Sequence, residues 1–286
     1  MKIDLHMHTN VSDGTDTPEE IMERVRSAGI DLFSVTDHDA VKAGQIIKKI
    51  RKDDDPGFIT GVEFSCRDEK GKYHILGYGF DPYDEYILKL VERGHSLRMK
   101  KVLARLGFLR DEFNVLFPEE EVNDLLALDN PGKPHIGNMM VRYGYAQTKE
   151  EAINKFINRQ RFADEYLRPE EAIKGIIDGG GIPVLAHPFY GSGDELILDE
   201  EMEDRLKYLM AYGLKGVEVF YSGFTVKLRR DMLNMADKYH LYVTAGSDYH
   251  GGNKLIELGD TGLKDTMDIP LGMMHFFDDL NEILYR

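Results

Sequence analysis

Short apolar runs alternate with amphipathic helical patterns along this chain, and the alternation restricts the fold more than any other feature. Thr17-Pro18-Glu19-Glu20 combines an N-cap, a proline at the first helical position and a capping-box glutamate, which predicts a helix over 18–28. The apolar runs are KIDLHMH, DLFSVTDHD, FITGVEFSC, IPVLAHPF, GLKGVEVFY and LYVTAGSDYH. Such alternation is typical of parallel βα units, so we expect an α/β fold.

The alternation is interrupted in the middle of the chain. Residues 65–80 have the pattern of a β-hairpin with its turn at 69–72. From 84 to 168, helical patterns follow one another without an intervening strand. We therefore expect a helical insertion at 84–168 in a domain formed by 1–83 and 169–286.

Two histidines lie close together in the first apolar run. In an extended strand, side chains alternate between the two faces, so His6 and His8 share one face while Leu5 and Met7 share the other. Residues i and i+2 are roughly 7 Å apart, which lets both imidazoles reach a single ion. A pair of surface histidines on an edge strand is the alternative for this motif alone.

Further potential metal ligands follow the other apolar runs. Parallel strands place their carboxyl ends at one face of a barrel, and active sites are built there. His74, in the returning hairpin strand, is expected to point to the same place. The nine candidates are His6, His8, Asp13, His38, Glu63, His74, His187, Asp248 and His250.

Gathering these nine groups without an ion would leave unpaired charges and unsatisfied imidazoles, at a cost of several kcal/mol each. We therefore expect two or three divalent cations to be bound there. The only cysteine, Cys66, excludes a thiolate cluster, so nitrogen and oxygen must supply the ligands. Mixed imidazole and carboxylate ligation suits manganese, iron or zinc, and the sequence does not choose among them.

Charge and hydropathy exclude several classes of partner. A formal net charge of −15 argues against binding to duplex nucleic acid or anionic lipid. Bound cations would still make the cleft attractive to a small anionic substrate. No run approaches the roughly 20 apolar residues that span a bilayer, and no signal-peptide pattern is present, so we expect no membrane association and a cytoplasmic protein. The oligomeric state cannot be predicted.

The motifs HMHTNVSDG, SVTDHDAVKAGQ, GVEFS, HILGYG, KPHIGNMMV, VLAHP and TAGSDYHGGNK occur in order over nearly the whole chain. In this order they resemble the PHP family, named for polymerase and histidinol phosphatase proteins. The resemblance is greatest to stand-alone bacterial phosphoesterases that act on nucleoside 3′,5′-bisphosphates and on the 5′ ends of short RNAs. It implies a distorted (β/α)7 TIM-like barrel whose active-site face is covered by the insertion.

The resemblance also implies three metals. The first would be held by His6, His8, Glu63 and Asp248, the second by Asp13, His38 and His250, and the third by His74 and His187 with Glu63 as a bridge. Such clusters hydrolyse phosphate esters by activating a water as hydroxide, so no protein nucleophile is required. His187 and His135 are candidate general acids, and Asp248 is expected to be essential for turnover.

Substrate contacts are expected from the insertion and from loops that follow the strands. The candidates are Lys133, His135, Arg161, Ser222, Arg229 and Lys254. Residues 89–110 also carry seven basic side chains against the single acid Glu92. We interpret this strip mainly as a solvated helix face with one or two functional members, which would hold a second phosphate.

The leading hypothesis is a phosphatase acting on a phosphate monoester of a small metabolite, namely a nucleoside 3′,5′-bisphosphate or a short 5′-phosphorylated oligonucleotide. A cyclic phosphodiesterase acting on a sugar cyclic phosphate is the alternative on the same scaffold. A metal-dependent amide hydrolase is the alternative from another reaction class. A non-catalytic module would be expected to lack several ligands, and this chain has all nine.

Overall fold

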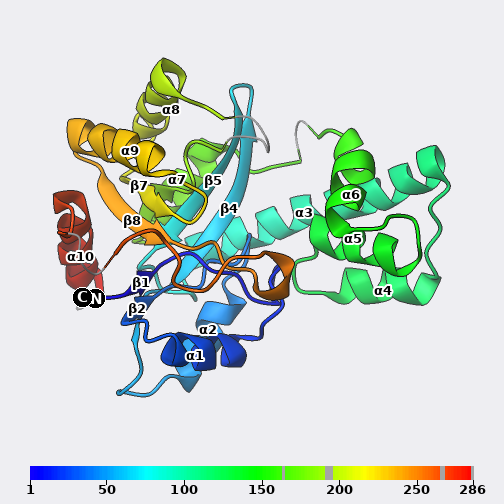
Figure 1. Ribbon diagram of the computed structural model, residues 1–286, viewed down its shortest axis with the longest axis horizontal. Helices are drawn as coiled ribbons and strands as arrows, with labels where there is room; N and C mark the ends of the chain where they lie inside the picture. Colours follow the sequence, from blue (N-terminus) through cyan, green and yellow to red (C-terminus); the bar gives the residue numbers. More distant parts are fainter. Residues whose placement is uncertain (163–164, 191–195, 265–267, 285–286) are drawn as a thin grey trace.

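The computed structural model describes residues 1–162, 165–190, 196–264 and 268–284. The first sheet is short and parallel, with strands β1 (Ile3–Asp4), β2 (Leu32–Phe33) and β3 (Gly57–Phe58) in that order. Helices α1 (Pro18–Ser27) and α2 (Lys42–Ile50) connect these strands and lie together below them in Figure 1. The predicted capping box at Thr17 and Glu20 is confirmed.

The second sheet has five strands in the order β4-β5-β6-β7-β8. Strands β4 (Gly61–Asp68) and β5 (Gly71–Tyr78) form the predicted antiparallel hairpin, and β5 is also antiparallel to β6 (Ile182–Leu185). Strand β6 is parallel to β7 (Gly216–Tyr221), and β7 is parallel to β8 (Tyr242–Gly246). The helices of this half are α7 (Pro169–Asp178), α8 (Asp199–Met210), α9 (Val226–Tyr239) and α10 (Leu271–Leu284).

Isolated bridges connect the edges of the two sheets. Met7 pairs with Tyr249 beyond the ends of β1 and β8, and His38 pairs with Glu63 between the segment after β2 and β4. The Leu5 amide also donates to the Ala245 carbonyl at 2.8 Å. The protein is thus α/β, with two sheets held edge to edge around the residues that follow β1, β2 and β8.

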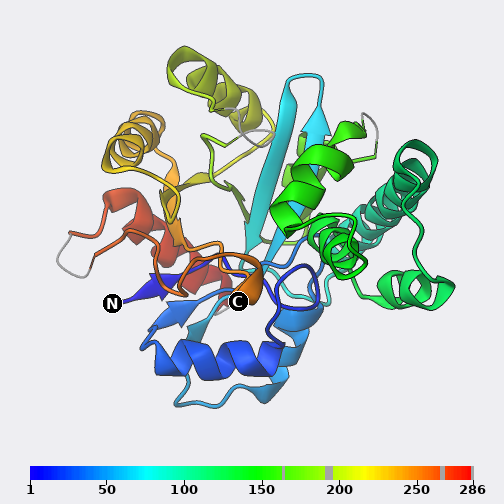
Figure 2. The ribbon, with the colours of Figure 1, turned by 45° about the vertical axis from the view of Figure 1, so that its right-hand side comes forward.

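Helices fill the segment between β5 and β6. They are α3 (Glu85–Phe113), α4 (Glu119–Ala127), α5 (Lys133–Arg142) and α6 (Lys149–Glu151), followed by a π turn at Ala152–Phe156 and a 3₁₀ turn at Ile157–Arg159. Figures 1 and 2 show α4, α5 and α6 to one side of the sheets, with the long α3 reaching them from the sheet side.

Three hydrophobic clusters stabilise this arrangement. The largest packs β4–β8 against α7–α10 and includes Ile87 and Leu90 from the start of α3. A second lies between the first sheet and helices α1 and α2. The third joins Val102 and Leu109 of α3 to α4 and α5. Helix α3 therefore runs from the main core into a separate helical core. Among the described helices, none is both long enough and apolar enough to cross a membrane.

Candidate metal centre

The segment after β1 presents its two histidines as the H-x-H motif predicts. Leu5 and Met7 pack into the hydrophobic clusters, whereas His6 and His8 point together into a polar centre. Both imidazoles are fully buried, and their ring centroids are 5.3 Å apart. The strand alternation thus separates core residues from candidate ligands.

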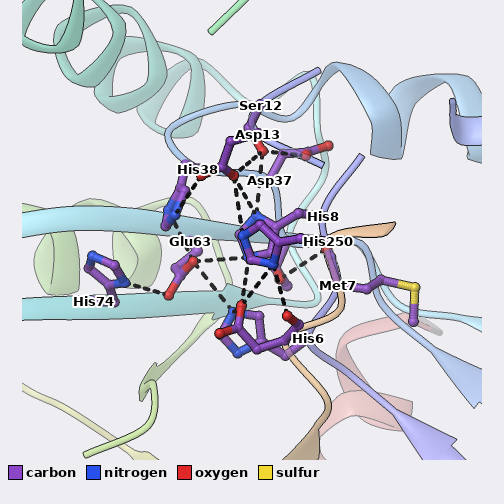
Figure 3. A network of polar contacts seen from close by, with 12 residues as sticks. His6, Met7, His8, Ser12, Asp13, Asp37, His38, Glu63, His74 and His250 are labelled. Atoms are coloured by element: carbon purple, nitrogen blue, oxygen red, sulfur yellow. Dashed lines mark hydrogen bonds and ion pairs between the residues drawn. The ribbon is translucent and has the colours of Figure 1, made fainter. Parts of the chain in front are cut away.

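The Glu63 carboxylate lies in the middle of the histidine cluster (Figure 3). It is 1% exposed on β4. Its oxygens lie 3.4 Å from His6 Nε2, 3.2 Å from His8 Nε2, 3.0 Å from His38 Nδ1, 2.8 Å from His74 Nδ1 and 3.2 Å from His187 Nε2. One carboxylate therefore touches imidazoles contributed by four separate parts of the sequence.

Two aspartates complete the cluster. Asp248 Oδ1 lies 3.3 Å from His8 Nε2 and 3.4 Å from His250 Nδ1. Asp13 Oδ1 lies 3.3 Å from His250 Nε2, and its Oδ2 lies 3.9 Å from His38 Nε2. All nine candidate ligands thus meet at one place, which we call the metal centre.

Potential ligand atoms form three close groups within the metal centre. In each group the atoms lie within 4.8 Å of one another: His6, His8 and Asp248; His8, Asp13, His38 and His250; and His38, Glu63 and His74. These groups overlap the three ligand sets that the family resemblance implies, although His8 and His38 each belong to two of them. How the ligands divide among individual metals stays a prediction.

Several buried polar atoms in the metal centre lack a hydrogen bond, although such atoms are normally satisfied. Within the described residues, no hydrogen-bond partner is found for His6 Nε2, His8 Nε2, His38 Nδ1, His74 Nδ1, His187 Nδ1 or Glu63 Oε2. His74 Nδ1 lies 2.8 Å from Glu63 without the alignment that a hydrogen bond requires. Nitrogen and oxygen atoms that point into a common space without hydrogen-bonding to one another are arranged like the ligands of a divalent cation. The residues therefore fit the implied metals.

Electrostatics in the metal centre favour a bound cation. Burial raises the pKa of Glu63, but the charges of His74, His38 and His6 outweigh it and hold that pKa well below its usual value. Burial lowers the pKa of His6, and the carboxylates of Glu218, Glu63 and Asp248 raise it well above the usual value. The buried carboxylates therefore need a compensating positive charge. Protonated imidazoles provide it in the absence of metal, and bound metal cations provide it when they are present.

The backbone at the rim is held in an uncommon conformation. Asp39, His187 and Asp248 have φ angles of 50°, 28° and 59°, in the left-handed region that non-glycine residues seldom adopt. Such strain persists only where the surrounding structure imposes it, and it is frequent at functional sites. His187 and Asp248 are themselves predicted ligands, and Asp39 directly follows the predicted ligand His38.

Two buried carboxylates that the sequence analysis did not select support the ligands. Glu218 on β7 lies 2.9 Å from His6 Nδ1 and accepts the His187 amide at 2.8 Å. Asp37 accepts the amide and hydroxyl of Thr9, at 2.8 and 2.7 Å, and the Ser12 hydroxyl at 2.6 Å, which anchors the loop that carries Asp13. The available signal for Glu218 was a single acid inside the apolar run GVEVFY.

Of the predicted substrate residues, Lys254 and His135 lie nearest to the metal centre. Lys254 Nζ is 2.5 Å from Asp248 Oδ2, which also accepts the Tyr221 hydroxyl at 3.0 Å. His135 accepts the Gly132 amide at Nδ1 (3.0 Å), so it caps α5. The pKa of His135 is lowered from its usual value by burial and by the charge of Arg98, against the opposing charge of Asp13.

The other predicted substrate residues are more scattered. Lys133 donates to Asn158 at 2.6 Å. Ser222 Oγ, after β7, has no hydrogen-bond partner in the described structure. Arg161 is exposed. The Arg229 guanidinium packs directly against Gly262 and leaves no space for a side chain there. The structure gives no contact between Arg161 or Arg229 and the metal centre among the described residues.

Comparison with known proteins gives one family and several relatives of similar length. The family model of the PHP domain matches residues 4–168. A phosphoribosyl 1,2-cyclic phosphate 1,2-diphosphodiesterase of Eggerthella lenta is 27% identical over 264 residues, which cover 87% of this chain and 94% of the relative. A 5′-3′ exoribonuclease of Haemophilus influenzae is 27% identical over 266 residues, 90% of this chain and 93% of the relative.

A 3′,5′-nucleoside bisphosphate phosphatase of Chromobacterium violaceum is 27% identical over 282 residues, which cover 94% of this chain and 92% of the relative. Among solved structures, a Bifidobacterium adolescentis protein assigned as a metal-dependent phosphoesterase superposes with a TM-score of 0.77 at 26% identity. That match covers 99% of this chain and 95% of the other. The similarity therefore extends over both sheets and the intervening helices.

Proposed function

The chain belongs to the PHP domain family and is a metal-dependent phosphoesterase, and we propose that it hydrolyses a phosphate monoester of a small phosphorylated metabolite. The observation that carries the proposal is the convergence of nine imidazole and carboxylate side chains, six of which have a buried polar atom without a hydrogen-bond partner in the described structure. A site that binds several divalent cations is suited to a substrate with concentrated negative charge.

The residues that would hold the metals are the nine of the metal centre. When bound, the cations supply charge that stabilises phosphoryl oxygens and lowers the pKa of a water molecule. The chain itself fixes the ligand tautomers. His250 Nδ1 lies 2.8 Å from the Asp248 carbonyl, and because a carbonyl only accepts, Nδ1 must carry the proton. His250 Nε2 is then left as a lone pair that faces Asp13.

His135 is suited to contact the substrate. Its Nδ1 accepts the Gly132 amide, so a neutral His135 carries its proton on Nε2 and can donate it in a hydrogen bond to a phosphoryl or leaving-group oxygen. His187, whose Nδ1 has no hydrogen-bond partner within the described chain, is the second candidate for proton donation. Lys254 partly neutralises Asp248 and contributes a cation at the rim.

We propose a nucleoside 3′,5′-bisphosphate or a short 5′-phosphorylated oligonucleotide as the substrate. The names of two relatives support this class, because one is a nucleoside bisphosphate phosphatase and the other an exoribonuclease. The name of a third relative favours the alternative, hydrolysis of a cyclic sugar phosphate. Amide hydrolysis has no support in the names of the curated relatives given above, and it stays the alternative from another reaction class.

A direct assay separates these candidates. Manganese-loaded protein is incubated in parallel with adenosine 3′,5′-bisphosphate, a short 5′-phosphorylated RNA, a ribose cyclic phosphate and an N-acyl amino acid, and products are resolved by chromatography. We expect inorganic phosphate from the bisphosphate or nucleotides from the RNA. If the cyclic phosphate is the one compound hydrolysed, the cyclic phosphodiesterase is favoured. If the N-acyl amino acid is the one compound hydrolysed, phosphoester hydrolysis is rejected.

We also propose that the two sheets are arcs of the distorted (β/α)7 barrel that the sequence resemblance implies. Counting β3 and β4 as one interrupted strand gives seven, and the bridges Met7–Tyr249 and His38–Glu63 connect the arcs at both edges. The division into 1–83 with 169–286 and an insertion at 84–168 is proposed on the same basis. The separate hydrophobic cluster of α3, α4 and α5 supports it.

A further inference from the structure

Three cations lie buried on one face of α3. Arg98, Lys101 and Arg105 are 8%, 5% and 5% exposed. Their spacing of three and four residues places them in a row on the helix surface that extends about 10 Å at 1.5 Å per residue. The sequence analysis interpreted this basic strip mainly as a solvated face. For these three members that interpretation is wrong, because their face of the helix is turned inward.

Only the first cation of the row has a carboxylate partner. The Arg98 guanidinium binds Asp39 Oδ2 at 2.8 and 3.1 Å and donates to Ser65 Oγ at 3.1 Å. Lys101 and Arg105 form no ion pair with a carboxylate of the described residues. Instead, Lys101 Nζ lies 3.5 Å from the centroid of the Tyr166 ring, and the Arg105 guanidinium lies 5.0 Å from that of Phe162. Arg105 Nε has no hydrogen-bond partner in the described structure.

Positive charge accumulates around these two residues. Burial and the charges of Arg98, Arg105 and Lys72 lower the pKa of Lys101 to about 6, although Asp39 raises it. Burial, together with Arg105 and Lys72, lowers the pKa of Lys133 to about 7. In a chain with a net charge of −15, these five cations lie together, and among the described residues only Arg98 has a carboxylate partner, Asp39. Such an arrangement destabilises the free protein and stabilises any anion that enters it.

The row begins beside the metal centre and leads away from it. A Cβ added at Gly132 would lie 3.4 Å from the Arg98 guanidinium and 3.9 Å from Asp13 Cβ, so Arg98 and the ligand Asp13 flank the same glycine. The Asp39 partner of Arg98 donates its amide to the Glu63 carbonyl at 2.9 Å. A substrate that reacts at the metal centre can therefore extend along α3 toward Lys101 and Arg105.

We propose that Lys101 and Arg105, assisted by Lys133, bind a second phosphate of the substrate, the one that is not hydrolysed. Arg98 is already paired with Asp39 and positions the start of the row. This inference rests on the proposed phosphoesterase function and narrows its substrates to phosphate esters that carry a further phosphate within about 10 Å of the reacting one. Lys101 and Arg105 have no carboxylate partner among the described residues, and in this proposal the substrate supplies the negative charge.

The test compares substrates with and without the second phosphate. Metal-loaded wild type and the variants Lys101→Met and Arg105→Met are assayed with adenosine 3′,5′-bisphosphate and with each adenosine monophosphate. We expect wild type to prefer the bisphosphate. In each variant the ratio of kcat/KM values, bisphosphate over the better monophosphate, should fall roughly ten- to a hundredfold, as for loss of a charge-assisted contact. Lys101→Arg should keep most of the preference.

Lys100→Met is the matched control, because Lys100 is exposed on the same helix and should leave the ratio unchanged. Thermal unfolding distinguishes binding from a structural role: Lys101→Met should unfold at the same or a higher temperature, since it removes a buried amine that has no acidic partner among the described residues and that loses its proton on folding. Equal losses on both kinds of substrate, or an unchanged ratio, would overturn the inference.

Failure of the inference and failure of the proposed function give different results. If wild type releases phosphate from monophosphates as fast as from the bisphosphate, the second site is refuted and the phosphoesterase function stands. If wild type hydrolyses none of them, the proposed function fails, and calorimetric titration with adenosine 3′,5′-bisphosphate still decides the site. Weaker binding to Lys101→Met than to Lys100→Met would support it, and equal binding would refute it.

Discussion

His6 Nδ1 lies 2.9 Å from Glu218 Oε1, and the other oxygen of the same carboxylate accepts the His187 amide at 2.8 Å. Glu218 is fully buried on β7, on the opposite side of the His6 ring from Glu63. A carboxylate that receives Nδ1–H fixes the imidazole orientation and leaves Nε2 as the ligand atom. One side chain thus positions two candidate ligands that are 181 residues apart in a 286-residue chain.

Glu218→Gln should weaken metal binding without removing any ligand. The amide has one acceptor instead of two, so it cannot hold both His6 and the His187 amide as the carboxylate does. We expect a ten- to hundredfold loss of metal affinity, the usual effect of removing an outer hydrogen-bond partner of a ligand. The measurement is a competition titration against a chelator. Glu200→Gln, at an exposed position on α8, should bind metal as wild type does.

The buried Arg98–Asp39 pair should be strongly coupled. Arg98→Met leaves the Asp39 carboxylate buried with the Ser65 amide, at 3.0 Å, as its remaining donor, and we expect the free energy of unfolding to fall by about 3–5 kcal/mol. Arg98→Met combined with Asp39→Asn should recover part of the loss. Urea unfolding of the metal-loaded single and double variants measures the coupling. Additive losses in the double variant would show that the pair is not coupled.

Lys101 should give stability a specific dependence on pH. Burial and the surrounding cations lower its pKa from 10.5 to about 6, so between these values the unfolded chain carries a proton that the folded chain does not. The unfolded state binds more protons, and the free energy of unfolding therefore rises with pH, by at most about 1.4 kcal/mol per pH unit from this group. The charged or titratable groups that face Lys101 are Arg98, Arg105, Lys72, Asp39 and Tyr166.

Urea unfolding at pH 6.5, 7.5 and 8.5 checks this dependence. The difference in unfolding free energy between wild type and Lys101→Met isolates Lys101 from the pH dependence of metal binding, which both proteins share. The slope of the unfolding free energy against pH should be smaller in Lys101→Met than in wild type and in Lys100→Met. Parallel slopes in all three proteins would show that Lys101 keeps its proton in the folded state.

The convergence of the candidate ligands could be predicted because these residues follow simple local patterns. His6 and His8 share a strand face by alternation, and His38, Glu63, His187 and Asp248 each follow or end an apolar run. Parallel strand topology then brings such positions together without any knowledge of individual contacts. The hairpin and the capping box at Thr17 were equally local and were predicted, although the turn is two residues shorter than predicted because Gly71 and Lys72 already pair in β5.

Features that depend on tertiary packing were not predicted. Glu218 was missed because an isolated acid in an apolar strand does not reveal what it will contact. The three buried cations of α3 were misjudged because the charges of the strip suggest a solvated helix, whereas Lys101 and Val102 both face inward where α3 passes between two hydrophobic cores. Ser222 and Arg229 were predicted as substrate contacts, and only the coordinates show that Arg229 packs against Gly262.

Metal content tests the central claim most directly. Elemental analysis of protein purified without chelator, beside an Asp248→Ala variant prepared in the same way, should find two or three equivalents of manganese, iron or zinc per wild-type chain. The variant should keep its fold by circular dichroism, hold fewer equivalents and lose turnover. If wild type holds less than one equivalent even after incubation with these metals, the nine converging side chains do not form a metal centre and the account is contradicted.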